Sequence, residues 1–252
     1  MEPILRVTDL SKSFSRAGKD AFFAVDHVSF EVMPGEILGI VVESGSGKST
    51  IAKLITRQID ATTGTIEIDG QDITKLTGRQ LIPVYAKIQM VFQTPAESFD
   101  PRRTLGDGIC ESLRNKGVSK AVREEKARSL LKQCGLPVEF LGRYPHQVSG
   151  GQCQRAAIAR ALMCDPQILI FDEATSALDV TVQKQIIELL QELQKEKELA
   201  YLFICHNLAL VQELCDKVIV LYDGKIVEQG LPDEVILHPQ SSYAKRLVDA
   251  VL

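Results

Sequence analysis

Short apolar segments recur along the chain at intervals that suit the strands of a β-sheet. Alternating apolar and polar residues, bounded by Pro and Gly, predict strands of a mixed sheet at residues 4–7, 28–32 and 65–68. Continuous apolar runs are typical of parallel strands buried on both faces, and they predict further strands at residues 37–41, 168–171, 202–204 and 218–221.

Helical patterns lie between these strands, at residues 51–55, 120–133, 156–163 and 180–195. Strands that alternate with helices predict an α/β fold with a parallel sheet. The long charged stretches between residues 104 and 164 differ in character from the rest of the chain and predict an inserted helical lobe. We therefore expect one domain with a core lobe at about 1–93 and 165–230, a helical lobe at about 94–164 and a helical tail at about 231–252.

Composition narrows the class of protein. The chain has 252 residues, a net charge of −4, 45% hydrophobic and 25% charged residues, values typical of a soluble globular protein and unlike those of a general nucleic-acid binder. We expect no membrane span, because no apolar run reaches about 18 residues, and no secretory signal. The six cysteines form no C-x-x-C pair, so we expect reduced thiols.

A glycine-rich stretch between a predicted strand and a predicted helix carries the clearest chemistry. Backbone N–H groups at a helix N-terminus bind phosphate, and the order strand, loop, helix is the one that a phosphate-binding loop requires. Lys48 is expected to reach the terminal phosphates of ATP, and the Ser49 hydroxyl to bind Mg²⁺. The predicted ATP-binding residues here are Glu43, Ser44, Gly45, Ser46, Gly47, Lys48, Ser49 and Thr50.

Val42 departs from this motif, which has glycine at the corresponding position. If the position requires a positive φ, a β-branched residue there would carry about 1–3 kcal/mol of strain. Two interpretations follow: the loop tolerates Val42, or this copy of the loop is impaired.

Two carboxylates follow the apolar run 168–171. Because ligands of α/β folds bind at the carboxyl ends of parallel strands, Asp172 is predicted to join the Mg²⁺ shell, directly or through water. Glu173 is the candidate base that orients or deprotonates an attacking water.

A second glycine-rich turn, Ser149 to Arg155, precedes the helical run 156–163. It predicts a second anion site at a helix N-terminus. The alternative is a plain helix cap, because Ser is a good N-cap residue.

Taken in order, these motifs resemble the ATP-binding-cassette family over essentially the whole chain. The resemblance rests on the phosphate loop at 43–50, Gln93 after the run 88–92, the signature 149–152, the acidic pair 172–173 and the segment 176–179, followed by His206. It implies a P-loop NTPase core with a mixed sheet, an N-terminal antiparallel part and the inserted helical lobe.

The resemblance also implies a mechanism in which two cassettes meet head to tail around ATP and Mg²⁺. The catalytic residues would be Glu173, His206 as a sensor of the γ-phosphate, and Gln93 as a contact to Mg²⁺ or water. The signature would contact the γ-phosphate of ATP bound to the partner cassette, through Ser149, Gly150 and Gly151. Gln152 and Asp179 are further implied ATP contacts. Phe14 is the candidate for stacking on adenine, with Phe22 and Phe23 as alternatives.

Residues 93–105 and the tail 238–245 are similar to those of peptide and nickel importer ATPases. The chain departs from that branch at Val42, at Ala174 and at Leu252, where many peptide-importer subunits continue. The implied partners are a second cassette, membrane permease subunits that contact the surface from Gln93 to about Thr104, and indirectly an extracytoplasmic substrate-binding protein. The implied location is the cytoplasmic face of a bacterial membrane, with no nucleic-acid partner.

Two other hypotheses compete with an importer motor. A cassette ATPase for translation or DNA maintenance would carry two cassettes or long coiled-coil insertions, and neither is present. A non-hydrolysing partner cassette is the hypothesis that Val42 raises, and the intact Lys48, Asp172, Glu173 and His206 argue against it.

Overall fold

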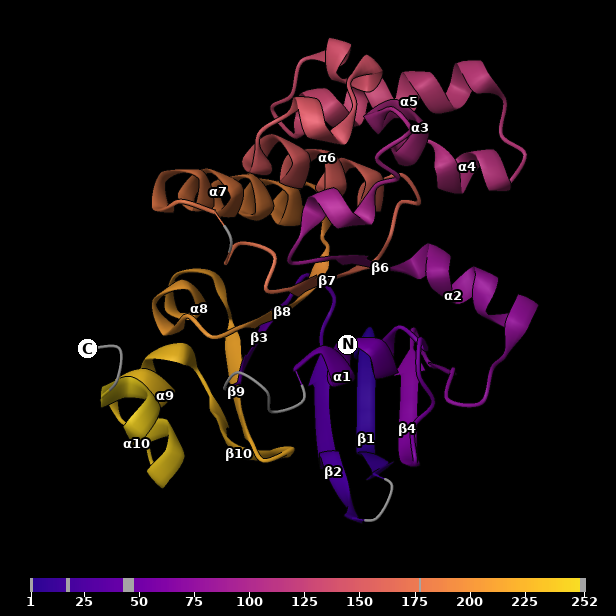
Figure 1. Ribbon diagram of the computed structural model, residues 1–252. Coiled ribbons are helices and arrows are strands. Elements are labelled where there is room, and N and C mark those ends of the chain that lie inside the picture. The colour runs from indigo at the N-terminus through magenta and orange to yellow at the C-terminus, as the bar shows by residue number, and fades with distance from the viewer. Residues whose placement is uncertain (1, 17–18, 43–47, 177, 250–252) are drawn as a thin grey trace.

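Two β-sheets organise the part of the chain that the computed structural model describes, residues 2–16, 19–42, 48–176 and 178–249 (Figure 1). The smaller sheet is antiparallel, in the order β2-β1-β4-β5. Its strands are β1 Leu5–Arg16, β2 Lys19–Val32, β4 Thr63–Ile68 and β5 Gln71–Asp72. The N-terminal strands thus form a separate sheet and do not join the mixed one, because β1 pairs with β2 along one edge and with β4 along the other.

The larger sheet has six strands in the order β10-β9-β3-β8-β7-β6. All neighbouring pairs are parallel except β9 and β10, so this is the mixed sheet. Its strands are β3 Ile37–Val42, β6 Ile88–Val91, β7 Ile168–Asp172, β8 Ala200–Cys205, β9 Lys217–Tyr222 and β10 Lys225–Gly230. The buried strands predicted from apolar runs are confirmed to within a residue or two.

Helices α3, α4, α5 and α6 gather on the same side of the larger sheet as α7 (Figure 1). The predicted helix 120–133 coincides with α5. The helices are α1 Lys48–Ile55, α2 Ile82–Lys87, α3 Leu105–Ile109, α4 Glu111–Asn115, α5 Lys120–Gln133, α6 Gly150–Leu162, α7 Val180–Lys197, α8 Leu208–Leu214, α9 Pro232–Leu237 and α10 Ser242–Asp249. In the described chain, no helix is both long and apolar enough to cross a membrane.

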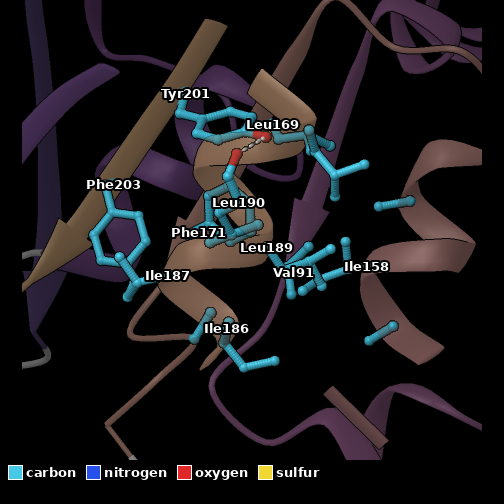
Figure 2. Packing of buried hydrophobic residues seen from close by; sticks show 14 of the residues in the cluster. Val91, Ile158, Leu169, Phe171, Ile186, Ile187, Leu189, Leu190, Tyr201 and Phe203 are labelled. Carbon is cyan, nitrogen blue, oxygen red and sulfur yellow. Dashed lines mark hydrogen bonds between the residues drawn. The ribbon is translucent and has the colours of Figure 1, made fainter. Parts of the chain in front are cut away.

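The strands β3, β7, β8 and β9 of the larger sheet are apolar on both faces, and their alternate residues belong to two different cores. Tyr201 and Phe203 of β8 point to the face covered by α6 and α7, whereas Leu202 and Ile204 point to the space between the two sheets, where α1 packs. Figure 2 shows the first core, in which Phe171 lies edge-on to Tyr201 with ring centroids 5.1 Å apart, and the Tyr201 hydroxyl donates to the carbonyl of Leu190 at 3.0 Å. This core continues into α5 and α6, so the predicted helical lobe shares its apolar interior with the sheet.

A carboxylate of β10 binds the segment between the two C-terminal helices, α9 and α10. Glu228 of β10 accepts hydrogen bonds from the backbone N–H groups of Gln240 and Ser241, both at 2.8 Å, just before α10 begins. Tyr243 of α10 stacks on Tyr222 with centroids 4.3 Å apart. These contacts give a physical role to the tail pattern seen at residues 238–245.

Candidate functional site

Four neighbouring parallel strands bring the predicted catalytic residues to one edge of the larger sheet. Gln93 lies just beyond β6, Asp172 ends β7 and His206 follows β8. The strand β3, which precedes the phosphate loop, is the next neighbour of β8. Because the strands run in the same direction, their carboxyl ends meet at this edge, where α/β folds bind ligands.

The phosphate loop itself lies outside the described residues: Glu43, Ser44, Gly45, Ser46 and Gly47 are not among them, and neither is the side chain of Lys48. The flanking elements have the predicted order, with β3 ending at Val42 and α1 beginning at Lys48. Ser49 and Thr50 occupy the first turn of α1.

Val42 does not have the strained geometry considered above. It is the last residue of β3, pairs with Leu221 of β9 and has no positive φ. Its side chain is fully buried between the two sheets. The expected strain at this residue is therefore absent, because a strand conformation suits a β-branched side chain.

A cavity of about 390 Å³ opens beside the start of α1. Ser49, Gln93 and Asp172 line it together, although they come from three separate parts of the chain. Hydroxyl, carboxamide and carboxylate oxygens are the ligands that Mg²⁺ prefers in proteins. The residues present therefore fit a magnesium ion and the phosphates it would accompany.

Glu173 is held at the same edge in an unusual backbone conformation. Its φ is 50°, in the left-handed region, and its backbone N–H donates to the Ile204 carbonyl at 2.9 Å. The Glu173 side chain is mostly buried, and one carboxylate oxygen lies 3.6 Å from Nδ1 of the exposed His206. A left-handed non-glycine residue persists only where its surroundings hold it, and such residues cluster at functional sites.

Ser176 connects Glu173 to Gln93. Its hydroxyl donates to the Glu173 carbonyl at 2.9 Å and lies 3.2 Å from Nε2 of Gln93. The sequence placed Ser176 in a family motif but assigned it no contact of its own. Only the fold brings its partner close, since Gln93 and Ser176 are 83 positions apart.

The second glycine-rich turn is a helix cap in this structure. The Ser149 hydroxyl accepts from the Gln152 backbone N–H at 3.3 Å, and the Gln152 side chain accepts from the Ser149 N–H at 2.9 Å. This reciprocal pair is a capping box at the start of α6. Burial raises the pKa of the adjacent Cys153 thiol to about 11, so this thiol stays protonated near neutral pH.

Glycine at 151 permits a close approach between α6 and α7. A Cβ at Gly151 would lie 2.4 Å from Cγ1 of Val182, whereas one at Gly150 would meet its nearest neighbour, Leu178, at 3.7 Å. Asp179 caps α7 by accepting from the Val182 N–H at 3.0 Å. The residues that line the 390 Å³ cavity include neither 149–152 nor 179, so within the described chain these predicted ATP contacts lie apart from it.

The predicted adenine contact, Phe14, lies on β1 opposite Phe22 of β2. The two rings stack with centroids 5.8 Å apart, and the Lys12 ammonium is 5.2 Å from the Phe14 ring. Phe22 and Phe23 are 41% and 47% exposed. The choice among these three aromatic residues stays a prediction.

The structure shows which side chains are exposed on and near the surface expected to contact a permease, residues 93 to about 104. Pro101 is exposed, but Phe99 is only 4% exposed, because its ring lies under the guanidinium of Arg160 at 4.8 Å. The exposed aromatic side chains in this region are Tyr85 and Phe92, which line a groove of about 460 Å³. The ring of Phe99 is therefore not accessible to a partner in this conformation, and permease contact with the surface from Gln93 to about Thr104 stays a prediction.

Comparison with known proteins agrees with this geometry. Residues 25–176 match the family model described as ABC transporter. The chain is 43% identical over 250 residues to the oligopeptide transport ATP-binding protein OppF of Streptococcus mutans, covering 98% of this chain and 81% of that protein. It is 44% identical over 258 residues to the glutathione import ATP-binding protein GsiA of Salmonella paratyphi A, covering 99% of this chain and 41% of GsiA.

Among solved structures, the chain is similar to the ATP-binding cassette MJ0796, seen as a dimer in a post-hydrolysis state with ADP and Pi. The TM-score is 0.82 at 29% identity, with 90% of this chain and 98% of that chain covered. This similarity supports the arrangement of both sheets and of the helices around them.

Proposed function

This chain belongs to the ABC transporter family as an ATP-hydrolysing transport subunit, and we propose that it is the motor of a bacterial peptide importer. The observation that carries the proposal is the convergence of Ser49, Gln93 and Asp172 on one cavity beside Glu173. The names of the similar proteins favour peptides, glutathione included, as the transported class. Nickel, the other solute suggested by residues 93–105 and the tail 238–245, does not appear in the names of these similar proteins.

In this proposal Ser49, Gln93 and Asp172 hold Mg²⁺, which neutralises charge on the phosphates of ATP when bound. Glu173 orients or deprotonates the attacking water, and its carboxylate is mostly buried. His206, 3.6 Å from that carboxylate, is the side chain placed to respond to the terminal phosphate.

The proposed working unit is a head-to-tail pair of cassettes. Residues 149–152 and 179 do not line the 390 Å³ cavity of their own chain. This supports the proposal, because the N-terminus of α6 can then contact the nucleotide of a partner cassette. The similar cassette MJ0796 was solved as a dimer. The partner is a second copy of this chain or a related cassette.

Permease subunits are proposed to dock in the 460 Å³ groove between β6 and the helical lobe. Phe92 lines both this groove and the 390 Å³ cavity, so a side chain seated in the groove would lie next to the metal-binding residues. Such docking would hold the chain at the cytoplasmic face of the membrane, with a substrate-binding protein acting on the far side.

A cell-based assay tests the docking surface. Changing Tyr85, which lines the groove but not the 390 Å³ cavity, to serine is expected to abolish uptake of a labelled tripeptide while MgATP binding by the purified chain is retained. Val122→Ser is the control, because Val122 is an exposed apolar residue, 59% exposed, that lies on α5 outside the groove. Unchanged uptake in Tyr85→Ser would refute this placement.

The catalytic assignment is tested by Glu173→Gln. This variant is expected to bind MgATP with unchanged affinity and to hydrolyse it at least about 100-fold more slowly, the low end of general-base effects. Lys48→Ala is the contrasting variant, expected to weaken nucleotide binding itself. Normal turnover by Glu173→Gln would exclude Glu173 as the base.

The impaired-cassette alternative is tested at Val42. Titration calorimetry should give micromolar MgATP affinity, about −8 kcal/mol, for both the natural chain and Val42→Gly. Because Val42 is fully buried, the glycine variant is first checked for folding by circular dichroism. Binding by the glycine variant alone would favour the impaired cassette and overturn the proposed motor function.

A further inference from the structure

The hydroxyl of Ser176 lies between two residues of the proposed catalytic site. The number of protons on this hydroxyl determines to which residue it donates a hydrogen bond and from which it accepts one. It is 2.9 Å from the carbonyl oxygen of Glu173 and 3.2 Å from Nε2 of Gln93. A serine hydroxyl has one proton to donate and lone pairs to accept with. A carbonyl oxygen can only accept, so the proton of Ser176 is committed to Glu173.

That commitment decides the orientation of the Gln93 side chain. Ser176 has no second proton, so it accepts a hydrogen bond from the Gln93 –NH₂ group. The reverse orientation, with the carboxamide oxygen against Ser176, would place two acceptors together unless the bond to Glu173 were broken. Only the arrangement with nitrogen toward Ser176 uses both contacts.

Gln93 lines the cavity that it shares with Ser49 and Asp172, and with its nitrogen engaged by Ser176 its carboxamide oxygen is the atom left for that cavity. Oxygen is the atom that Mg²⁺ accepts as a ligand, and a carboxamide nitrogen is not. A glutamine side chain is long, and the Gln93 residue is exposed, so without a tether it would sample many rotamers.

We propose that Ser176 is a positioning residue that turns the carboxamide oxygen of Gln93 toward the metal-binding cavity. The inference rests on the proposed function only for the identity of the metal ion. The orientation of Gln93 is a property of the chain without nucleotide.

Two hydrogen bonds to the carbonyl of Glu173 hold Ser176 next to Gln93. Glu173 has a φ of 50°, and its carbonyl accepts both from the Ser176 hydroxyl and from the Ser176 backbone N–H at 3.1 Å. Ser176 therefore joins the turn that carries the proposed base to the residue that carries the proposed metal ligand. The orientation of one is tied to the conformation of the other.

The first test uses nuclear magnetic resonance on the nucleotide-free, ¹⁵N-labelled chain. The side-chain –NH₂ signals of Gln93 are identified by their loss in Gln93→Ala. In Ser176→Ala these signals are expected to shift toward those of free glutamine and to exchange faster with water. Ser176→Thr, which keeps the hydroxyl, is expected to preserve them.

Ser98→Ala is the matched control. Ser98 lines the same cavity and its hydroxyl also donates to a backbone carbonyl, that of Pro95 at 2.6 Å, but it has no contact with Gln93. The Gln93 signals should be unchanged in this variant. Unchanged Gln93 signals in Ser176→Ala would overturn the inference, whatever the catalytic role of Glu173 proves to be.

The second test measures metal binding by electron paramagnetic resonance of Mn²⁺ in the presence of a non-hydrolysable ATP analogue. Ser176→Ala is expected to bind Mn²⁺ about fivefold more weakly, the factor for one neutral hydrogen bond. In a Gln93→Ala background the same change should have no further effect. An equal effect in both backgrounds would mean that Ser176 does not act through Gln93, and the inference would fail.

Discussion

Replacing Gly151 by alanine should destabilise the fold, whereas the same change at its neighbour Gly150 should not. A Cβ at Gly151 would lie 2.4 Å from Cγ1 of Val182, so the two atoms would have to separate by about 1 Å to reach ordinary contact. Val182 cannot yield by changing rotamer, because a β-branched side chain in a helix has one strongly preferred χ1. Helices α6 and α7 would therefore have to move apart.

The magnitude follows from two opposing effects. Overpacking a well-packed site costs about 1–3 kcal/mol, while replacing glycine by alanine in a helix gains up to about 1 kcal/mol. The net loss for Gly151→Ala is thus about 1–2 kcal/mol, which lowers Tm by about 3–6 °C in a chain of this size. Gly150→Ala has room for its Cβ, 3.7 Å from Leu178, and should leave Tm equal or slightly higher.

Thermal unfolding followed by circular dichroism checks this prediction. Val182→Ala removes the opposing methyl groups, so Gly151→Ala should cost little when combined with it. If Gly151→Ala unfolds at the temperature of the natural chain, the argument from close helix packing is refuted. Gly150→Ala then separates folding from function: a stable variant with reduced hydrolysis would place that glycine at the nucleotide of a partner cassette.

Three further predictions concern other parts of the chain. Burial acts to raise the pKa of Glu228, but the hydrogen bonds from the backbone before α10 together outweigh it, so this pKa lies below its ordinary value of 4.5. The Glu228 carboxylate therefore stabilises the fold above pH 4.5. It loses this effect as the pH falls through the lower pKa of the folded state. Glu228→Gln should lower Tm by more at pH 7 than at about pH 3, and an equal difference at both pH values would contradict this. Arg160→Lys should lower the free energy of unfolding by about 1 kcal/mol, because lysine cannot stack a planar guanidinium on the Phe99 ring. Urea unfolding measures this change, and an unchanged free energy of unfolding would argue against the contact. Iodoacetamide should label Cys164 of the native chain before Cys134, because Cys164 is partly exposed whereas burial raises the pKa of the Cys134 thiol to about 12. Equal labelling rates by mass spectrometry would contradict the burial of Cys134.

From local sequence patterns, a site residue could be placed only where its position depends on the segment that contains it. The apolar run 168–171 predicts a buried strand, and the carboxylates that follow it must lie at the end of that strand. A cap such as Ser149 is equally local, since donor and acceptor are three residues apart. The phosphate loop followed from the same local logic, although its residues 43–47 lie outside the described chain.

Residues whose environment is built from distant segments escaped prediction. Phe99 belongs to a stretch that suggested an exposed contact, yet Arg160, from a helix about 60 residues later, covers its ring. Val42 suggested strain, but the backbone conformation at that point follows from pairing with β9. In both cases the deciding partner is remote in the sequence.

The sequence by itself determined the elements of this protein and their order, because hydrophobic periodicity, glycine-rich turns and helix caps act over fewer than about ten residues. Tertiary structure alone decided that the N-terminal strands form their own sheet, that Gly151 lies against Val182, and that Ser176 meets Gln93 across 83 positions. Such pairings depend on how whole strands and helices pack, and no local pattern encodes the distance between two surfaces that meet only in the folded chain.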